Sequence, residues 1–427
     1  DPRRRAAGER PARPTRDRAA AAPGERPARR PRPTKRRAEG QWALGYREPL
    51  NPNEQSKKDD NPLNVRARIE TLTGWLEKEG FTVERGIAGM DTAFRAVWKH
   101  GEGGPNIGLL CEYDALAGLG HACGHHMQGP AILGAAKALK DAAIDAPYTI
   151  TVYGTPAEES ISGKVVMLEN GCTFEELDVA LMMHGGPATQ VDVKSLALNK
   201  LKIIYHGVCS HAALKPEKGR SALDGLIMAC QGVEFLREHV PSDVRMHYTI
   251  VNCGGTAANV VPGYAEASMY VRSYSRTDLD GVVARVKKVL QGAAMMTETE
   301  VEIIEEKSLD NKIPVLSLNE LVMEQAEKVK APCIRPARQK TGSTDFGNVM
   351  RHVPGTCIRV AFVPEGAAAH SQEYLDAGKT EAAHNAVVYG AKILALTGAQ
   401  LIEDPEKLEA IKKEFHENLA KELNGQS

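Results

Sequence analysis

Three histidines and one cysteine lie within six positions of the segment GHACGHHMQG, which spans residues 120–129. They are His121, Cys123, His125 and His126. A thiolate and imidazoles this close together could bind a transition metal, and the thiol could also act as a nucleophile. The same residues could instead pack without any chemical role. The rest of the chain must decide between these readings, because one short cluster does not complete a metal site.

Further candidate ligands follow other apolar runs of the chain. Glu158 and Glu159 come after YTITVYG. His184 comes after ALMM, and His370 comes after IRVAF. In open parallel sheets, binding sites form beyond the carboxyl ends of the strands, so these side chains are expected at one edge of one sheet. Thiolate, imidazole and carboxylate together suit zinc or manganese, and five ligands suit two metal ions that share a bridging group.

The elements that must position these candidates alternate along the chain. Short apolar runs typical of buried strands occur at residues 106–116, 148–160, 178–186 and 357–371. Helical spacing of apolar residues occurs between or beside them, at residues 65–81, 130–142 and 381–398. Buried strands that alternate with helices predict an α/β fold with a mixed, mostly parallel sheet.

Residues 195–306 follow a different order, namely strand, helix, two strands, helix and strand. This order predicts an α+β, ferredoxin-like module that is inserted into the first domain. The first domain would then comprise residues 61–194 and 307–427. Residues 1–60 would form a tail and linker outside both domains.

The tail differs sharply in composition from the rest of the chain. Residues 1–40 hold 13 Arg and 1 Lys against 5 acidic residues, and they have almost no large apolar side chains. Such a segment is expected to be disordered. It could be a nucleic-acid-binding arm, a transit peptide or a gene-assignment artefact. Its five acidic residues and lack of serine disfavour the transit peptide.

Bulk composition narrows the class of protein. The formal net charge of −1 gives no overall attraction to nucleic acid or to a membrane, and no aromatic residues interleave with the arginines of the tail. No run of 18 apolar residues and no secretory signal are visible in the sequence. The eight cysteines are scattered without a CxxC pair, which favours reduced thiols and a cytoplasmic location. The sequence therefore predicts no nucleic-acid partner and no membrane partner.

The motifs together resemble the aminoacylase and glutamate carboxypeptidase superfamily of di-metal amidohydrolases, also called peptidase family M20. The nearest branch contains aminobenzoyl-glutamate hydrolases, auxin-conjugate hydrolases and an aminoacylase-like dipeptidase. The resemblance runs from about residue 66 to about residue 400. It rests on the order and spacing of EYDALAGLGHACGH, GTPAEE, MMHGG, GVCSHAALKPEKGRSALD, GGTAANVVPG, GSTDF and AAAHSQEY.

The resemblance implies two divalent ions, zinc or manganese, at the candidate cluster. Cys123 would bridge the two ions, and Asp114 would orient the CGH loop without touching them. Glu158 would be the general base of amide hydrolysis. The remaining metal ligands implied are His125, Glu159, His184 and His370.

The resemblance also implies roles for the inserted module, as a lid and as the contact of a homodimer. His211 would reach the partner's active site and stabilise the oxyanion there, helped by Asn259. Arg272 would bind the substrate carboxylate, although a salt bridge within the module is an alternative for this residue. Gly342 and Ser343 would shape the substrate pocket.

Two features depart from the pattern of the family. His126 takes the position after CGH where related branches carry Asp or Asn, which leaves the choice of substrate open. No opening helix of the usual kind is recognisable before residue 65, in the polar segment 41–64. His121 and His126 are not ligand positions in this branch, and they would lie in the pocket or behind the ligands.

The function expected is hydrolysis of the amide bond between an acyl or aminoacyl group and an amino acid. Candidate small-molecule substrates are N-acyl amino acids, aminobenzoyl-glutamate and dipeptides with an unusual amino acid. Two alternatives stay open at this point. One is a non-catalytic metal-binding protein of the same fold, and the other is a thiol amidase with Cys123 as its nucleophile.

Overall fold

The computed structural model describes residues 62–425. The tail predicted for residues 1–60 lies outside this range, and so does nearly all of segment 41–64. The first described helix, α2 (Pro62–Lys78), begins three residues before the helix expected at 65–81 and also ends three residues earlier.

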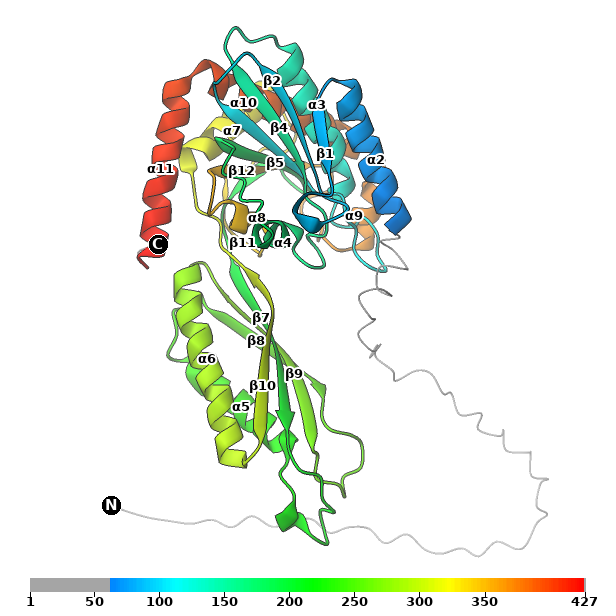
Figure 1. Ribbon diagram of the computed structural model, residues 1–427, viewed down its shortest axis with the longest axis vertical. Coiled ribbons are helices and arrows are strands. Elements are labelled where there is room, and N and C mark those ends of the chain that lie inside the picture. The colour runs from blue at the N-terminus through cyan, green and yellow to red at the C-terminus, as the bar shows by residue number, and fades with distance from the viewer. Residues whose placement is uncertain (1–61, 426–427) are drawn as a thin grey trace, which may run out of the picture. The chain divides into compact units, whose positions relative to one another are not determined.

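An eight-stranded sheet forms the centre of the larger domain (Figure 1). Its strands run in the order β1-β2-β4-β3-β5-β12-β6-β11. The pairs β4-β3, β3-β5, β5-β12 and β6-β11 are parallel, whereas β1-β2, β2-β4 and β12-β6 are antiparallel. The sheet is therefore mixed and mostly parallel, as predicted. The strands are β1 (Thr82–Arg85), β2 (Phe94–His100), β3 (Asn106–Cys111), β4 (Tyr148–Gly154), β5 (Val179–Gly186), β6 (Gln190–Ser195), β11 (Arg338–Thr341) and β12 (Gly355–Ala361).

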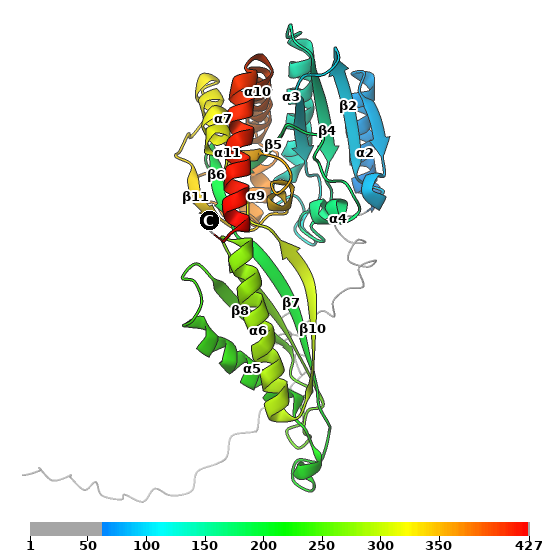
Figure 2. The ribbon, with the colours of Figure 1, turned by 60° about the vertical axis from the view of Figure 1, so that its left-hand side comes forward.

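Helices cover both faces of this sheet (Figure 2). One face packs against α3 (Gln128–Asp141), α7 (Leu316–Lys328) and α10 (Glu381–Glu403). The short helices α4 (Gly163–Glu169) and α8 (Phe346–Val349) lie on the other face. Two further helices, α9 (Gln372–Ala377) and α11 (Pro405–Leu423), complete the domain.

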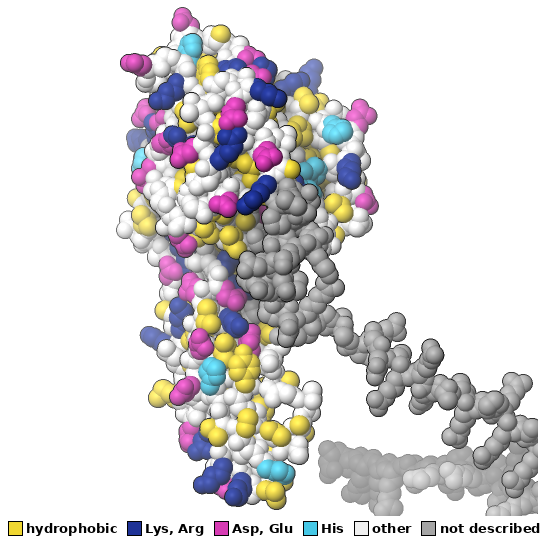
Figure 3. Space-filling model, turned by 45° about the vertical axis from the view of Figure 1, so that its right-hand side comes forward, with side chains coloured by type: hydrophobic (Ala, Val, Ile, Leu, Met, Phe, Trp, Pro, Cys, Tyr) yellow, Lys and Arg dark blue, Asp and Glu magenta, His cyan; other side chains and the backbone are white. Residues whose placement is uncertain are grey.

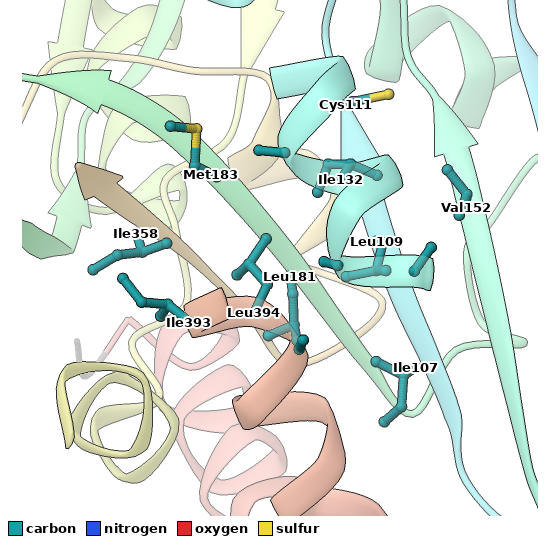
Figure 4. Packing of buried hydrophobic residues seen from close by; sticks show 14 of the residues in the cluster. Ile107, Leu109, Cys111, Ile132, Val152, Leu181, Met183, Ile358, Ile393 and Leu394 are labelled. Carbon is teal, nitrogen blue, oxygen red and sulfur yellow. The ribbon is translucent and has the colours of Figure 1, made fainter. Parts of the chain in front are cut away.

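The alternation of side chains along β3 explains the two-sided packing. Ile107, Leu109 and Cys111 face the larger core, while Leu110 belongs to the core on the opposite face. Figure 4 shows the larger core, in which the β3 and β5 side chains meet residues of α3 and α10. Burial on both faces is why these strands are continuous apolar runs.

Residues 197–309 form a second sheet with the strand order β10-β7-β9-β8, in which all pairs are antiparallel. Helices α5 and α6 pack on this sheet through a separate apolar core. The final strand ends at Leu309, three residues beyond the boundary expected at 306. The elements in chain order are β7 (Ala197–His206), α5 (Ala222–Arg237), β8 (Arg245–Asn252), β9 (Tyr264–Ser273), α6 (Arg276–Thr297) and β10 (Glu300–Leu309). We call residues 197–309 the inserted module.

Among the described residues, α10 is the one helix long and apolar enough to cross a membrane by length and composition. Its residues Ile393, Leu394 and Leu401 are buried in the core of the larger domain, where α10 packs against α3 and the sheet. Packing within the domain therefore accounts for the apolar character of this helix.

Candidate active site

The loop between β3 and α3 carries the Cys123 thiol and the His125 imidazole. Gly124 lies between them with φ of 86°, a left-handed conformation that would strain most other residues. His125 begins the short 3-10 helix η2 (His125–Met127), which leads directly into α3. The turn at Gly124 therefore brings the two side chains close together beyond the carboxyl end of β3.

The other predicted ligands come from three further elements at the same edge of the sheet. Glu158 and Glu159 lie in the loop between β4 and α4, and His184 lies near the end of β5. His370 lies between β12 and α9, and its backbone N–H donates to the carbonyl of Ala122 over 3.0 Å. His370 has φ of 63°, which is uncommon for a residue other than glycine. Such left-handed residues cluster at functional sites.

The structure brings all five predicted ligands together. Their ligand atoms, together with the Glu158 carboxylate, form three overlapping groups, each with all its atoms within 4.8 Å of one another. Cys123, His125 and Glu159 each belong to two of these groups, and Cys123 Sγ lies 3.5 Å from His184 Nε2. The groups are Cys123–His125–His184, Cys123–Glu159–His370 and His125–Glu158–Glu159.

The donor atoms fit a pair of divalent cations. Glu159 Oε1 is buried and accepts no hydrogen bond within the described residues, although His370 Nε2 lies 3.3 Å away. An unpaired buried carboxylate oxygen is costly unless a cation is near it. One thiol, three imidazoles and a carboxylate match the ligand chemistry of zinc and also accommodate manganese.

Asp114 ties the two ligand loops together. Its Oδ1 lies 3.2 Å from His125 Nδ1, and its Oδ2 accepts from the backbone N–H of Glu159 over 3.0 Å. Burial alone would lower the pKa of His125, but the nearby carboxylates of Glu112 and Asp114 raise it well above its usual value. The second carboxylate, Glu112, lies 3.2 Å from His125 Nε2 and is not among the predicted ligands.

A buried charged triad interacts electrostatically with Glu158. Lys164 Nζ lies 2.5 Å from Glu112 Oε1 and 2.7 Å from Asp345 Oδ1, and all three side chains are buried. Burial, followed by the charges of Asp345 and Glu112, raises the pKa of Glu158 to about 8. Divalent cations at the neighbouring ligands would lower this pKa again. Lys164 has no role predicted from the sequence, since a lysine at the start of a helix is usually solvated.

We expect Lys164→Met to destabilise the domain by roughly 3–5 kcal/mol, because Glu112 and Asp345 would keep buried charges without their cation. Chemical denaturation followed by circular dichroism measures this change. Lys137→Met is the matched control, because the side chain of Lys137 is 42% exposed and its ion pair with Glu79 contributes about 1 kcal/mol or less. Equal effects of the two substitutions would contradict the structural role of the triad.

The ligands open into one cavity of about 210 Å³. Gly342 and Ser343 of the GSTDF loop line it. Arg272 Nη1 donates to Ser343 Oγ over 3.3 Å, which brings this arginine of β9 to the rim of the cavity. Within residues 62–425 Arg272 forms no salt bridge, and its buried Nε has no hydrogen-bond partner. The alternative of a salt bridge within the module therefore has no counterpart in the structure.

Two predicted catalytic residues lie apart from the cavity. His211 and Asn259 are both exposed, and neither lines it. They are neighbours, because Ala212 N–H donates to the carbonyl of Asn259 over 2.9 Å and His211 pairs with Val260. A single chain therefore does not place them at the ligand cluster.

His121 and His126 pack against each other with ring centroids 5.1 Å apart. His126 Nε2 lies 2.8 Å from the carbonyl of Gly378. Neither histidine belongs to a metal-ligand group within the described part of the chain. Neither histidine lines the cavity that the ligands share.

A cluster of this chemistry, at the carboxyl edge of a mixed sheet, is typical of metal-dependent hydrolases. The sequence model of peptidase family M20/M25/M40 matches residues 108–396. The chain is 35% identical to the Xaa-Arg dipeptidase of Mus musculus, over 78% of this chain and 80% of that protein. It is 30% identical to one of the subunits of the p-aminobenzoyl-glutamate hydrolase of Escherichia coli K12, over 82% of this chain and 87% of that protein.

Solved structures share the fold at lower sequence identity. A dinuclear metal binding peptidase of family M20 from Bacillus subtilis superposes with a TM-score of 0.61 at 20% identity, over 79% of this chain and 92% of that one. An aminobenzoyl-glutamate utilization protein from Klebsiella pneumoniae gives a TM-score of 0.59, also at 20% identity, over 79% and 91% of the two chains. The chain belongs to peptidase family M20/M25/M40, which confirms the resemblance seen in its motifs.

Proposed function

We propose that this chain is a di-metal amidohydrolase that cleaves the bond between an acyl or aminoacyl group and an amino acid, with Glu158 as general base. The observation that carries the proposal is the placement of Glu158 beside five ligand groups that converge on one cavity. Relatives support the reaction class, because they are named as a dipeptidase, an aminobenzoyl-glutamate hydrolase and an N-acetyl-L-cysteine deacetylase.

Cys123, His125, Glu159, His184 and His370 would hold two ions, which supply a nucleophile at neutral pH and polarise the scissile carbonyl. Glu158 accepts the proton of the attacking water at its carboxylate. It then donates this proton to the departing amine nitrogen. Asp114 keeps the imidazole of His125 oriented through their 3.2 Å contact. Arg272, at the rim beside Ser343, binds the substrate carboxylate through its guanidinium group.

A homodimer would complete the site. His211 and Asn259 are exposed and lie outside the cavity, which is the arrangement expected if they act on a partner's substrate. Most of the large hydrophobic side chains exposed in the described residues belong to the inserted module, among them Leu214, Phe235 and Met295. Figure 3 shows hydrophobic side chains on the surface of this module. Exposed apolar side chains in such number favour a protein contact there.

Mixing two inactive variants tests the role of His211. Chains carrying His211→Ala and chains carrying Glu158→Gln should regain activity when they are co-refolded, since one of the two sites in each hybrid dimer would have an intact Glu158 and an intact His211. Release of free amino acid measures the recovery, and each variant refolded alone is the control. Well-folded hybrids without recovered activity would show that His211 does not act across a dimer.

The thiol amidase is disfavoured by the surroundings of Cys123. Burial raises the pKa of this thiol to about 12, outweighing its hydrogen bond with His125, so without a metal ion the thiol stays protonated. A thiolate is required for nucleophilic attack. A thiol amidase would survive chelators and lose activity with iodoacetamide. The non-catalytic alternative is disfavoured by the intact pair of Glu158 and Glu159.

The proposal is tested with N-acyl amino acids, aminobenzoyl-glutamate and dipeptides, incubated with protein loaded with zinc or manganese. Mass spectrometry of the released amine should reveal at least one substrate, and prolonged chelation should abolish its cleavage. No release from any of these compounds by protein with two ions bound would contradict the proposed reaction. Relative activity with zinc and manganese decides the metal.

All eight cysteines are free, which is compatible with the predicted cytoplasmic location.

A further inference from the structure

A row of polar side chains crosses the sheet beside the ligand cluster. The strand registers pair His184 of β5 with Arg359 of β12, and Asp192 of β6 with Arg338 of β11. Arg359 also pairs with Gln190, two residues before Asp192, so these side chains project from the same face. Arg359 Nη1 lies 3.2 Å from His184 Nδ1, which links the row directly to a predicted metal ligand.

Three cations in this row share a single carboxylate. Asp192 Oδ1 accepts from Arg338 Nε over 2.7 Å, and Oδ2 accepts from Arg359 Nε over 3.0 Å. Lys312 Nζ lies 3.8 Å from the same Oδ2, and its side chain is only 4% exposed. Burial alone would raise the pKa of Asp192, but Lys312 and Arg359 lower it below its usual value, so the carboxylate stays ionised.

Two positive charges in this row are therefore uncompensated. Within residues 62–425, Asp192 is the one carboxylate within 4.0 Å of Lys312 or Arg359. Both cations line the cavity, whereas Arg338 does not. A buried cation is costly unless an anion pairs with it, so a negatively charged group in the cavity would stabilise this arrangement.

The same cavity is also lined by the carboxylates of Glu112, Glu158 and Glu159. Glu112 is neutralised by Lys164, and the other two face the ligand cluster. The cavity thus combines ligands that would hold metal ions with two cations, Lys312 and Arg359, that would attract an anion. A substrate with a negative group in addition to its amide would match both sets of side chains.

We propose that Lys312 and Arg359 form a subsite for an additional carboxylate of the substrate, beyond the α-carboxylate of the released amino acid. The inference rests on the proposed function and names its substrate class. The additional carboxylate belongs either to an acidic amino-acid side chain or to a dicarboxylic acyl group. A basic side chain would be repelled by these two cations.

Matched substrate pairs test the subsite with the full chain loaded with zinc or manganese. N-acetyl-glutamate is compared with N-acetyl-glutamine, and N-succinyl-alanine with N-butanoyl-alanine, while N-acetyl-arginine is the basic probe. We expect the charged member of one pair to have the higher kcat/KM, and the pair that responds identifies the source of the carboxylate. Because a charge-assisted hydrogen bond is lost, Lys312→Met should reduce this preference on the order of tenfold to a hundredfold.

The variants include their own controls. Lys312→Met leaves Asp192 with two guanidinium partners, so no buried carboxylate loses all its cations. Lys312→Arg should keep the preference. Arg338→Gln also removes one cation from Asp192, but Arg338 lies outside the cavity lining, so this variant should reduce the preference less than Lys312→Met does.

Equal kcat/KM for both members of each pair in the unaltered protein would overturn the subsite. If Lys312→Met slows charged and neutral substrates alike, the role of Lys312 is structural and the subsite is rejected. If no compound is cleaved although two ions are bound, the proposed reaction fails, and calorimetry then tests the subsite separately. Glutarate should bind the unaltered protein more tightly than butyrate does, and Lys312→Met should abolish that difference. Equal binding of the two acids would reject the subsite.

Discussion

Glu158→Gln should lower kcat by about 10²–10⁴-fold while metal content stays unchanged, because proton transfer by a positioned carboxylate contributes a factor of this size. The amide keeps the shape of the side chain but can neither accept the proton of water nor deliver it to the amine. Metal content is measured by plasma mass spectrometry and turnover by release of free amino acid.

Glu169→Gln is the matched control for this substitution. Glu169 lies at the end of α4, in the same neighbourhood of the sequence, but it is exposed and does not line the cavity. Its replacement should leave both kcat and metal content unchanged. A Glu158→Gln protein with full activity would eliminate this residue as the general base.

Cys123→Ala should reduce the metal content from two ions per chain to one or fewer, with a corresponding loss of activity. The reason is geometric. Cys123 shares one group of ligand atoms with His184 and another group with His370. Removal of the thiol would leave the two ions without a shared ligand and with less charge compensation. Cys230→Ala is the control for general effects of removing a cysteine. Cys230 lies in α5 of the inserted module, far along the chain from the ligand loops.

Metal content is measured after equilibration of each protein with zinc or manganese and removal of unbound ions. A Cys123→Ala protein that still holds two ions would show that the thiol does not bridge them. Cys230→Ala should retain two ions and full activity. Loss of metal from both variants would indicate that the cysteine substitutions act through global instability.

The central strands of the sheet were predictable because burial on both faces leaves continuous apolar runs. β3 and β5 were recognised in this way, whereas β1, β2, β6 and β11 were not. β1 and β11 have four residues each, and β2 alternates buried and partly exposed side chains near the edge of the sheet. Strands that are half exposed or very short lack the apolar signal that marks the centre. The antiparallel edge of the sheet was missed for that reason.

The ligands were predictable because they follow strands whose carboxyl ends meet at one edge. The ion-pair partners that come from distant parts of the chain were not predictable. Glu112 and Lys164 are 52 residues apart, and Lys164 and Asp345 are 181 apart. The row of Asp192 and Arg359 depends on β12 pairing between β5 and β6, which no local pattern indicates. The roles of His211 and Asn259 stay predictions, since they require a second chain.

The most direct test of metal-dependent hydrolysis is a titration of metal-free protein with manganese or zinc, in the presence of a cleaved N-acyl amino acid or dipeptide. We expect no turnover without metal and a rate that rises to its maximum as two ions bind per chain. Bound metal and released amino acid are measured on the same samples. Full turnover by the metal-free protein, confirmed by elemental analysis, would contradict metal-dependent hydrolysis.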